Sequence, residues 1–232
     1  MTYNFKKARI AGALTLAFMA AVGNELTGYN LFDQEDGGNI ICSIDPSCRK
    51  LTDNEIIFAK TIFGDSLDYK KIKIFNRYLF GRKPEGASGR MWNGNIYAIT
   101  TDARSQDYAL DERLGNRRLF LHEMTHVWQY KSDPAFMVKG LSALIKADFN
   151  YSSLYPYEIK PHRTFKDYNF EQQADIADDY YGLTENLKKT DESGTSGQNE
   201  ICRDIISYER ILRPVLPIGP TPPQCLQIKA AP

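Results

Sequence analysis

The residues best suited to chemistry lie in one short stretch, the sequence HEMTH at positions 122–126. Side chains four positions apart on a helix project from the same face, so the imidazoles of His122 and His126 can bind one zinc ion. Between them, Glu123 stands where a carboxylate can take a proton from zinc-bound water and deliver it to a leaving amine. The spacing therefore predicts a zinc-dependent hydrolase with Glu123 as its base.

The chain around this motif has the pattern of a helix. Residues 116–131 (NRRLFLHEMTHVWQYK) place Leu119, His122, Glu123, His126 and Tyr130 on one side, and the apolar neighbours indicate that the helix is largely buried. Two of the three histidines in the chain fall in the motif. Two buried histidines satisfied by hydrogen bonds alone are the alternative, and the glutamate in register favours the metal site.

A third ligand is required, because catalytic zinc takes three protein ligands and leaves one position open. Residues 169–182 (NFEQQADIADDYYG) predict a second helix, which Asn169 can cap. On this helix Glu171 and Asp175 are one turn apart and face the same way. Glu171 is the candidate third ligand, and Asp175 is the candidate to orient a histidine through its other ring nitrogen. The alternative is a solvated acidic helix start, which the helix dipole favours by itself.

Together these motifs resemble those of a known class of enzyme. A HExxH helix followed some tens of residues later by a Glu-x-x-x-Asp helix resembles the gluzincin arrangement of zinc metallopeptidases. More closely, the chain between positions 50 and 185 resembles small bacterial zincin-like proteins described as Vgr-related or Rhs-associated. The segments that carry this resemblance are LTDNEIIFAKTIFGD at 51–65, Asp68-Tyr69, NGNIY at 93–97, LHEMTHVWQY at 121–130 and FEQQADI at 170–176. Gln129 also matches the glutamine of the HExxHxxQ pattern in zincin-like domains found with contractile injection systems.

The resemblance implies an α+β, zincin-like metallopeptidase fold with an active-site helix, a second metal-ligand helix and a small sheet. It implies His122, His126 and Glu171 as Zn²⁺ ligands and Glu123 as the catalytic carboxylate. The family does not define the substrate, and the expected activity is cleavage of a peptide bond in a protein or in peptidoglycan. The resemblance also implies an association with type VI or related secretion systems, with a secretion-system component or an immunity protein as partner. The alternative is a non-catalytic zincin-like binding or structural accessory protein of such a system, in which the metal stabilises the fold.

A zinc peptidase also needs a donor to the negative charge that develops on the carbonyl oxygen. Gluzincin-like sites usually use a tyrosine or histidine for this, and the candidates are His162, Tyr157 and Tyr168, in that order. Core packing is the alternative for each. In zincins a strand beside the active-site helix can pair with an extended substrate, so residues 96–100 are the candidate substrate edge. An ordinary sheet strand is the alternative there.

The remaining elements follow from local patterns, and their order is that of an α+β protein. Thr52 or Asp53 can cap a helix, and Asn93-Gly94 offers turn chemistry before a strand. The expected elements are a helix at 53–63, strands at 72–75 and 95–100 with a loop at 81–89 between them, a helix at 141–149, a polar turn or loop at 191–198, a helix at 200–212 and an extended proline-rich end.

The first residues have the pattern of a secretory signal. Three basic residues precede an apolar run at positions 10–22, and small residues up to Gly23 offer a cleavage site. The run is short for a membrane span; an uncleaved anchor and a core helix are the alternatives. The expected location is therefore periplasmic or secreted, with membrane contact only through this segment. Lys+Arg and Asp+Glu both number 29, so no strong field favours nucleic acid.

Cysteine usage agrees with export. The local pairs Cys42 with Cys48 and Cys202 with Cys225 are the expected disulfides, although four cysteines allow three connectivities, and free thiols remain the alternative. The expected organisation is a signal peptide at 1–23, a cysteine-containing flank at 24–50, a catalytic domain at 51–190, and a C-terminal helix with a proline-rich tail at 191–232, on or beside that domain.

Overall fold

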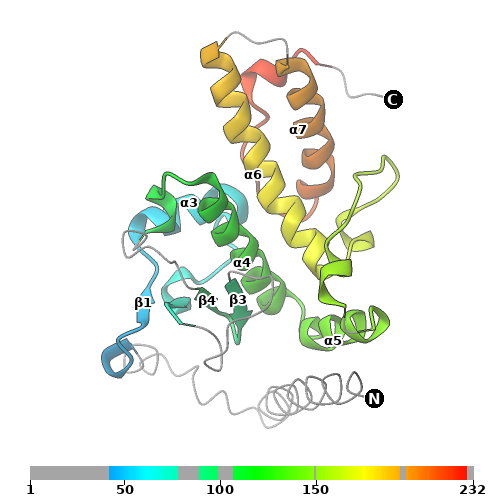
Figure 1. Ribbon diagram of the computed structural model, residues 1–232. Helices are drawn as coiled ribbons and strands as arrows, with labels where there is room; N and C mark the ends of the chain where they lie inside the picture. The colour runs from blue at the N-terminus through cyan, green and yellow to red at the C-terminus, as the bar shows by residue number, and fades with distance from the viewer. Residues whose placement is uncertain (1–41, 78–88, 99–106, 149, 194–196, 229–232) are drawn as a thin grey trace, which may run out of the picture. The chain divides into compact units, whose positions relative to one another are not determined.

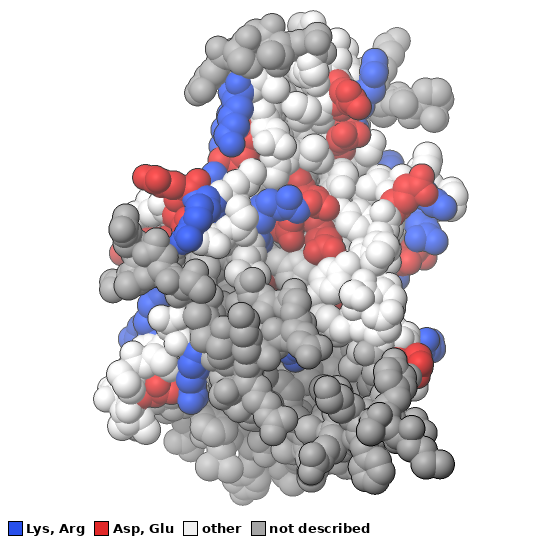
Figure 2. Space-filling view, viewed as in Figure 1, with Lys and Arg blue, Asp and Glu red and all other residues white. Residues whose placement is uncertain are grey.

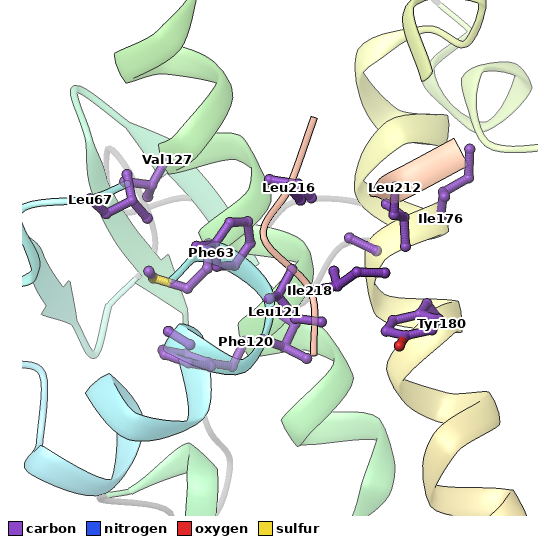
Figure 3. Packing of buried hydrophobic residues seen from close by; sticks show 14 of the residues in the cluster. Phe63, Leu67, Phe120, Leu121, Val127, Ile176, Tyr180, Leu212, Leu216 and Ile218 are labelled. Atoms are coloured by element: carbon purple, nitrogen blue, oxygen red, sulfur yellow. The ribbon is translucent and has the colours of Figure 1, made fainter. Parts of the chain in front are cut away.

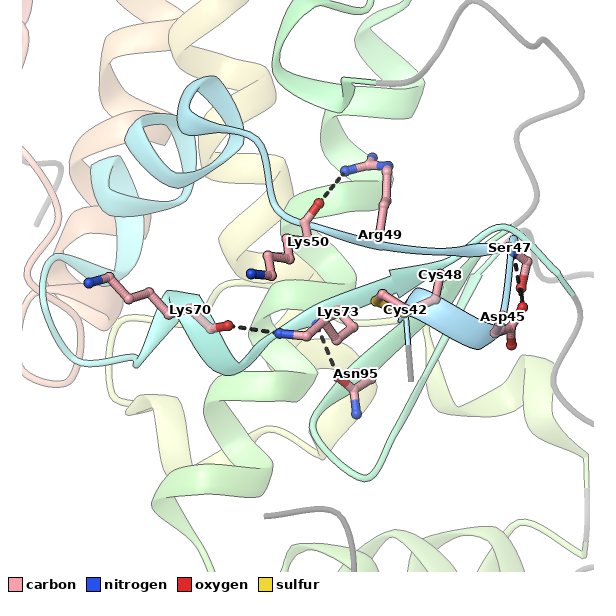
Figure 4. Close-up of a disulfide and its surroundings, with 9 residues drawn as sticks. All are labelled: Cys42, Asp45, Ser47, Cys48, Arg49, Lys50, Lys70, Lys73 and Asn95. Carbon is pink, nitrogen blue, oxygen red and sulfur yellow. Dashed lines mark hydrogen bonds between the residues drawn. A yellow bond between two sulfur atoms is a disulfide. The ribbon is translucent and has the colours of Figure 1, made fainter. Parts of the chain in front are cut away.

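A computed structural model describes residues 42–77, 89–98, 107–148, 150–193 and 197–228 (Figure 1). The chain divides into two compact units, residues 1–48 and residues 49–232. The segment expected to be a signal peptide lies outside the described residues, as does most of the cysteine-containing flank. In the first unit a disulfide joins Cys42 to Cys48, and the backbone N–H and hydroxyl of Ser47 both donate to the carboxylate of Asp45 (Figure 4).

Helix α3 (Asp53–Phe63) has the bounds that the sequence predicted, and of the two possible caps Thr52 is the one used. Thr52 and Glu55 form a capping box, in which each side chain accepts a hydrogen bond from the other's backbone N–H. The Glu55 carboxylate is fully buried and also accepts hydrogen bonds from the guanidinium of Arg49 and from the backbone N–H of Tyr108. This carboxylate therefore ties the start of α3 to the segment that leads into the next helix.

The four described strands form one small sheet in the order β1 (Cys48–Lys50), β2 (Lys73–Phe75), β4 (Asn95–Ala98), β3 (Gly89–Trp92). Strands β2 and β4 are parallel, with Ile74 opposite Ile96. Strands β3 and β4 form an antiparallel hairpin whose turn residues, Asn93 and Gly94, have φ values of 49° and 71°. Positive φ at both positions is what a tight two-residue hairpin turn requires. Lys73 donates its backbone N–H to the side chain of Asn95 (Figure 4).

This order corrects the expected substrate edge. Strand β4 lies between β2 and β3, so its backbone groups are already used on both sides, and residues 99 and 100 lie outside the described part of the chain. Among the described strands, β3 is the edge strand next to β4. The sequence pattern missed β3 because it directly follows a glycine- and proline-rich stretch.

Two long helices, α4 (Leu114–Ser132) and α6 (Phe170–Ser193), pack against each other and contain both predicted metal-binding motifs. Helix α7 (Gln198–Leu212) packs on α6 (Figure 1). Buried side chains of α3, α4, α6 and α7 form a common core. Leu216 and Ile218 of the C-terminal tail lie between Leu121 of α4 and Ile176 of α6 (Figure 3). The tail is therefore part of the core that holds the two helices.

Several boundaries differ from the sequence prediction. Helix α5 (Phe136–Lys146) begins five residues earlier than expected, because Asp133 and Pro134 separate it from α4. Helix α6 runs on to Ser193, since Leu187 is buried and extends its apolar face beyond Gly182. Both predicted disulfides are present, the second joining Cys202 of α7 to Cys225 in the tail.

The surface and helix lengths add two observations. Basic and acidic side chains are interspersed over the described surface on the face shown in Figure 2. Among the described helices, none combines the length and apolar character that crossing a membrane demands.

Candidate metal centre

Three buried side chains from two helices converge on one point. His122 and His126 come from successive turns of α4, and Glu171 comes from the first turn of α6. The Nε2 atoms of both imidazoles face the same carboxylate oxygen of Glu171, at 3.2 Å and 3.3 Å. Ligands bound about 2.0–2.1 Å from a tetrahedral ion lie roughly 3.3 Å from one another. The group therefore has the donor types and the spacing that a divalent metal such as zinc requires.

The charges of these groups are strongly coupled. Burial by itself raises the pKa of Glu171, but the charge of His126 and the hydrogen bonds with both histidines outweigh burial and hold the pKa well below its usual range. Burial opposes the charge of His126, yet Glu171 raises the pKa of that histidine. Because the pKa of His126 is raised, a cation that binds here competes with protons for the imidazoles.

The other nitrogen of each imidazole also has a partner. Nδ1 of His126 is 2.8 Å from Oε1 of Gln129, whose amide donates to the carbonyl of Phe170 and to Gln173. This network fixes Gln129 so that its oxygen can accept the Nδ1 proton of His126, which leaves Nε2 free to bind a metal. The HExxHxxQ spacing contained this signal, because Gln129 is three residues after His126 on the same helix.

His122 is held by two carboxylates of α6. Its Nδ1 is 3.0 Å from Oδ1 of Asp175, the residue predicted to orient a histidine, and 3.2 Å from Oδ2 of Asp178. Burial opposes the charge of His122, but hydrogen bonds with these carboxylates and with Glu171 raise its pKa well above the usual value. Sequence reasoning missed Asp178; its spacing of seven residues from Glu171 was the available signal.

Glu123 lies beside this group and is only 4% exposed. Its Oε2 atom is buried and has no hydrogen-bond partner in the described part of the chain. Burial raises the pKa of Glu123, although the two nearby histidines oppose this effect. Gly89 of β3 packs against the same side chain so closely that a Cβ there would be 2.8 Å from Oε1. A buried carboxylate oxygen without a hydrogen-bond partner in the described part of the chain therefore lies next to three metal-type ligands.

A tyrosine outside the predicted set contacts the group. The hydroxyl of Tyr151, in the 3₁₀-helix η4 (Tyr151–Leu154), donates a hydrogen bond to Oε1 of Glu171. Tyr155 is next to it, and its ring centroid is 6.2 Å from that of His122. Burial and Glu171 raise the pKa of Tyr151, so its phenol remains protonated. The aromatic crowding at 151–168 was visible in the sequence, but nothing distinguished Tyr151 within it.

The three side chains predicted as oxyanion donors have other surroundings. The hydroxyl of Tyr168 donates to the carbonyl of Glu158, and its ring is buried. Tyr157 donates to Asp179 and is hydrogen-bonded to Tyr208. His162 is exposed to solvent on the loop before α6. The structure therefore brings Tyr151 into hydrogen-bond contact with Glu171, and it engages the hydroxyls of Tyr157 and Tyr168 elsewhere.

These features define an α+β chain with a buried His/His/Glu group that can hold a metal. No protein-family model matches the chain. It is 36% identical over 134 residues to the type VI secretion system spike protein VgrG2b of Pseudomonas aeruginosa, a match that covers 57% of this chain and 13% of that protein. The solved effector domain of Pseudomonas aeruginosa VgrG2b superposes with a TM-score of 0.54 and 26% identity, covering 85% of this chain and 97% of that domain. The homologues are thus a spike protein and its effector domain.

Proposed function

We propose that this chain is a zinc-dependent peptidase that works as an effector domain related to type VI secretion. The observation that carries the proposal is the buried group of His122, His126 and Glu171 with the unpartnered oxygen of Glu123 beside it. A solely structural metal site has no use for a buried carboxylate that does not bind the metal. The proposed catalytic domain is the zincin-like part at 51–190, which contains α4 and nearly all of α6.

In this proposal His122, His126 and Glu171 would hold a zinc ion, which when bound would act as a Lewis acid toward water and the carbonyl of the scissile bond. Glu123 accepts a proton from the attacking water at Oε2 and returns it to the leaving amine. Asp175 and Gln129 keep the imidazole protons on Nδ1, which would leave each Nε2 able to bind a metal. The phenol of Tyr151 has one proton and donates it to Oε1 of Glu171, so its proposed role is to hold that carboxylate in place as a ligand.

The proposed substrate is an extended peptide or a peptidoglycan stem. Strand β3, the edge strand among those described, contacts α4, and its Gly89 packs against Glu123. A strand that pairs with β3 would lie next to the base. The likeness to an effector domain supports delivery outside the producing cell, with a secretion-system component or an immunity protein as partner. The signal peptide at 1–23 belongs to the same proposal.

A second candidate function follows from the likeness to a spike protein of the type VI secretion system. In that case the chain is a non-catalytic accessory component, and the metal stabilises the packing of α4 on α6. Both functions require metal binding, so only turnover separates them.

The test compares the wild-type protein with Glu123→Gln and with Glu185→Gln, a matched carboxylate-to-amide change on α6 that faces Arg117. Zinc content is measured together with cleavage of muropeptides and of an unfolded protein. We expect one zinc per chain in all three proteins and a loss of cleavage of at least ~10²-fold in Glu123→Gln alone. Zinc in every protein without cleavage would favour the accessory function, and absence of zinc would refute both.

A further inference from the structure

We propose that Arg118 is a positioning residue of the candidate metal centre, which holds Asp178 where it can fix the imidazole of His122. The inference rests on the proposed metal-binding function. It concerns the polar side chains that contact His122 at Nδ1, the ring nitrogen that does not face Glu171, where α4 packs on the middle of α6. Arg118 is one turn before His122 on α4, so the two side chains point toward the same stretch of α6.

Asp178 bridges these two residues with its two oxygens. Its Oδ1 accepts hydrogen bonds from Nε of Arg118 at 2.8 Å and from Nη2 at 2.5 Å. Its Oδ2 is 3.2 Å from Nδ1 of His122. The guanidinium therefore determines how the carboxylate is rotated, and the rotation determines whether an oxygen faces the imidazole. Two donors from one planar guanidinium give a geometry that a lysine cannot reproduce.

The charges explain why this carboxylate needs a cation. Nδ1 of His122 has one proton to donate, yet the carboxylates of Asp175 and Asp178 both lie within 3.2 Å of it. Glu171 approaches the same ring from the Nε2 side. The side chain of Asp178 is 8% exposed and that of Asp175 is 22% exposed, so water can solvate Asp175 better. A buried carboxylate beside two others is costly unless it is paired, and Arg118 supplies the pairing charge.

Arg118 is itself held from two sides. Its Nη2 also donates to Asp179, whose other oxygen accepts a hydrogen bond from the phenol of Tyr157. The Tyr157 oxygen is 2.8 Å from that of Tyr208 on α7. The Arg118 side chain runs across α6 at Gly182, where a Cβ would already be 3.4 Å from Cδ of Arg118. The network thus runs from α7 through α6 to the first histidine of the HExxH motif.

The experiment uses Arg118→Gln and Arg118→Lys, with Arg117→Gln as the matched control. Arg117 is the neighbouring arginine and also joins α4 to α6, through Glu185 at 3.2 Å, but it does not contact Asp178. The zinc dissociation constant is measured by competition with a chromophoric chelator. We expect Arg118→Gln to weaken zinc binding about 10–100-fold, as losses of such outer partners do. Arg118→Lys should be intermediate, and Arg117→Gln should stay within about twofold.

A second readout does not depend on metal or on turnover. In the metal-free protein, at a pH above the raised pKa of His122, the imidazoles are neutral and their ¹⁵N spectra report which ring nitrogen carries the proton. The chain has only three histidines. We expect Arg118→Gln to change the tautomer balance of His122 and to leave that of His162 unchanged. Arg117→Gln should change neither.

The outcomes separate this inference from the proposed function. Equal zinc affinity and an unchanged His122 spectrum in Arg118→Gln would overturn the inference. If that variant does not fold, Arg118→Lys decides, and wild-type affinity with a wild-type spectrum would overturn it. If the wild type and the variants show the expected differences in zinc affinity but the wild type cleaves nothing, the peptidase is refuted and the positioning role of Arg118 is supported. Absence of zinc binding together with an Arg118-dependent tautomer would refute the metal site alone.

Discussion

Replacing Gly89 by alanine is expected to slow the proposed reaction while leaving the metal in place. Gly89 is on β3 and does not belong to the ligand group, but a Cβ at this position would lie 2.8 Å from Oε1 and 3.1 Å from Cδ and Cγ of Glu123. Three atoms of one side chain would be too close at once, so the carboxylate has to move as a unit.

The size of the effect follows from these distances. Ordinary contact between such atoms begins at roughly 3.4 Å, so Oε1 must retreat by roughly 0.6 Å. Since a misplacement of 1 Å in a catalytic group can cost about 10²-fold, roughly half of that displacement predicts a loss in kcat of about tenfold. Tenfold corresponds to about 1.4 kcal/mol in the activation barrier. His122, His126 and Glu171 are not displaced, so zinc affinity should change little.

The assay measures kcat on a cleaved peptide together with zinc content. Gly115→Ala is the matched control, because a Cβ there has nothing within 4 Å and alanine suits a helix. In a Glu123→Gln background the Gly89→Ala change should have no further effect on kcat, since both act on the same carboxylate. Unchanged kcat in the single variant, or loss of zinc from it, would refute the reasoning.

Three further predictions concern stability. Gly64→Ala should lower the free energy of unfolding in denaturant by about 1–3 kcal/mol, because position 64 has a φ of 52° and a Cβ there would meet a proline ring of the tail at 2.8 Å. Replacing Cys202 and Cys225 by serine should lower it by about 3 kcal/mol, since this disulfide joins residues 23 positions apart. In the metal-free protein, calorimetry should give the highest Tm between pH 4.5 and 6.5, the ordinary pKa values of Glu171 and His126. Folding lowers the pKa of Glu171, so the stability that this group contributes is present above pH 4.5 and is lost as the pH falls through the lowered pKa. Folding raises the pKa of His126, so its contribution is present below pH 6.5 and is lost as the pH rises through the raised pKa.

Each stability prediction has a clear contrary result. Gly197→Ala is the control for position 64, because a Cβ at 197 has open space around it, and equal stability of the two variants would contradict the strain argument. A cysteine-free variant that unfolds at the wild-type denaturant concentration would show that the tail is held by packing alone. A metal-free Tm that rises steadily from pH 5 to pH 8 would contradict the assigned pKa directions.

Local patterns in the sequence made the three candidate ligands predictable. His122 and His126 are four residues apart, so they lie on the same face of any α-helix that contains both. Glu171 comes two residues after Asn169, a residue type that caps helix starts. The start of α3 was predictable for the same reason, since Thr52 and Glu55 are three residues apart and cap each other. These features depend on neighbours in the sequence.

Contacts between distant segments could not be predicted in this way. The closeness of Gly89 to Glu123 depends on how the β3–β4 hairpin sits on α4. The bridge from Arg118 to Asp178 depends on the register of α4 against α6, and Tyr151 reaches Glu171 from a 3₁₀-helix with no distinguishing pattern. The expected substrate edge was wrong for a related reason, because strand neighbours are set by pairing in space.

The position of the C-terminal tail has a consequence for the order of folding. Leu216 and Ile218 fill the space between α4 and α6, the helices that supply the histidines and Glu171 (Figure 3). A growing chain that has reached only α6 contains every candidate ligand but lacks the side chains that complete the core. We therefore expect the candidate ligands to be held rigidly only once the tail has packed between the helices, which makes completion of the candidate metal centre a late step of folding.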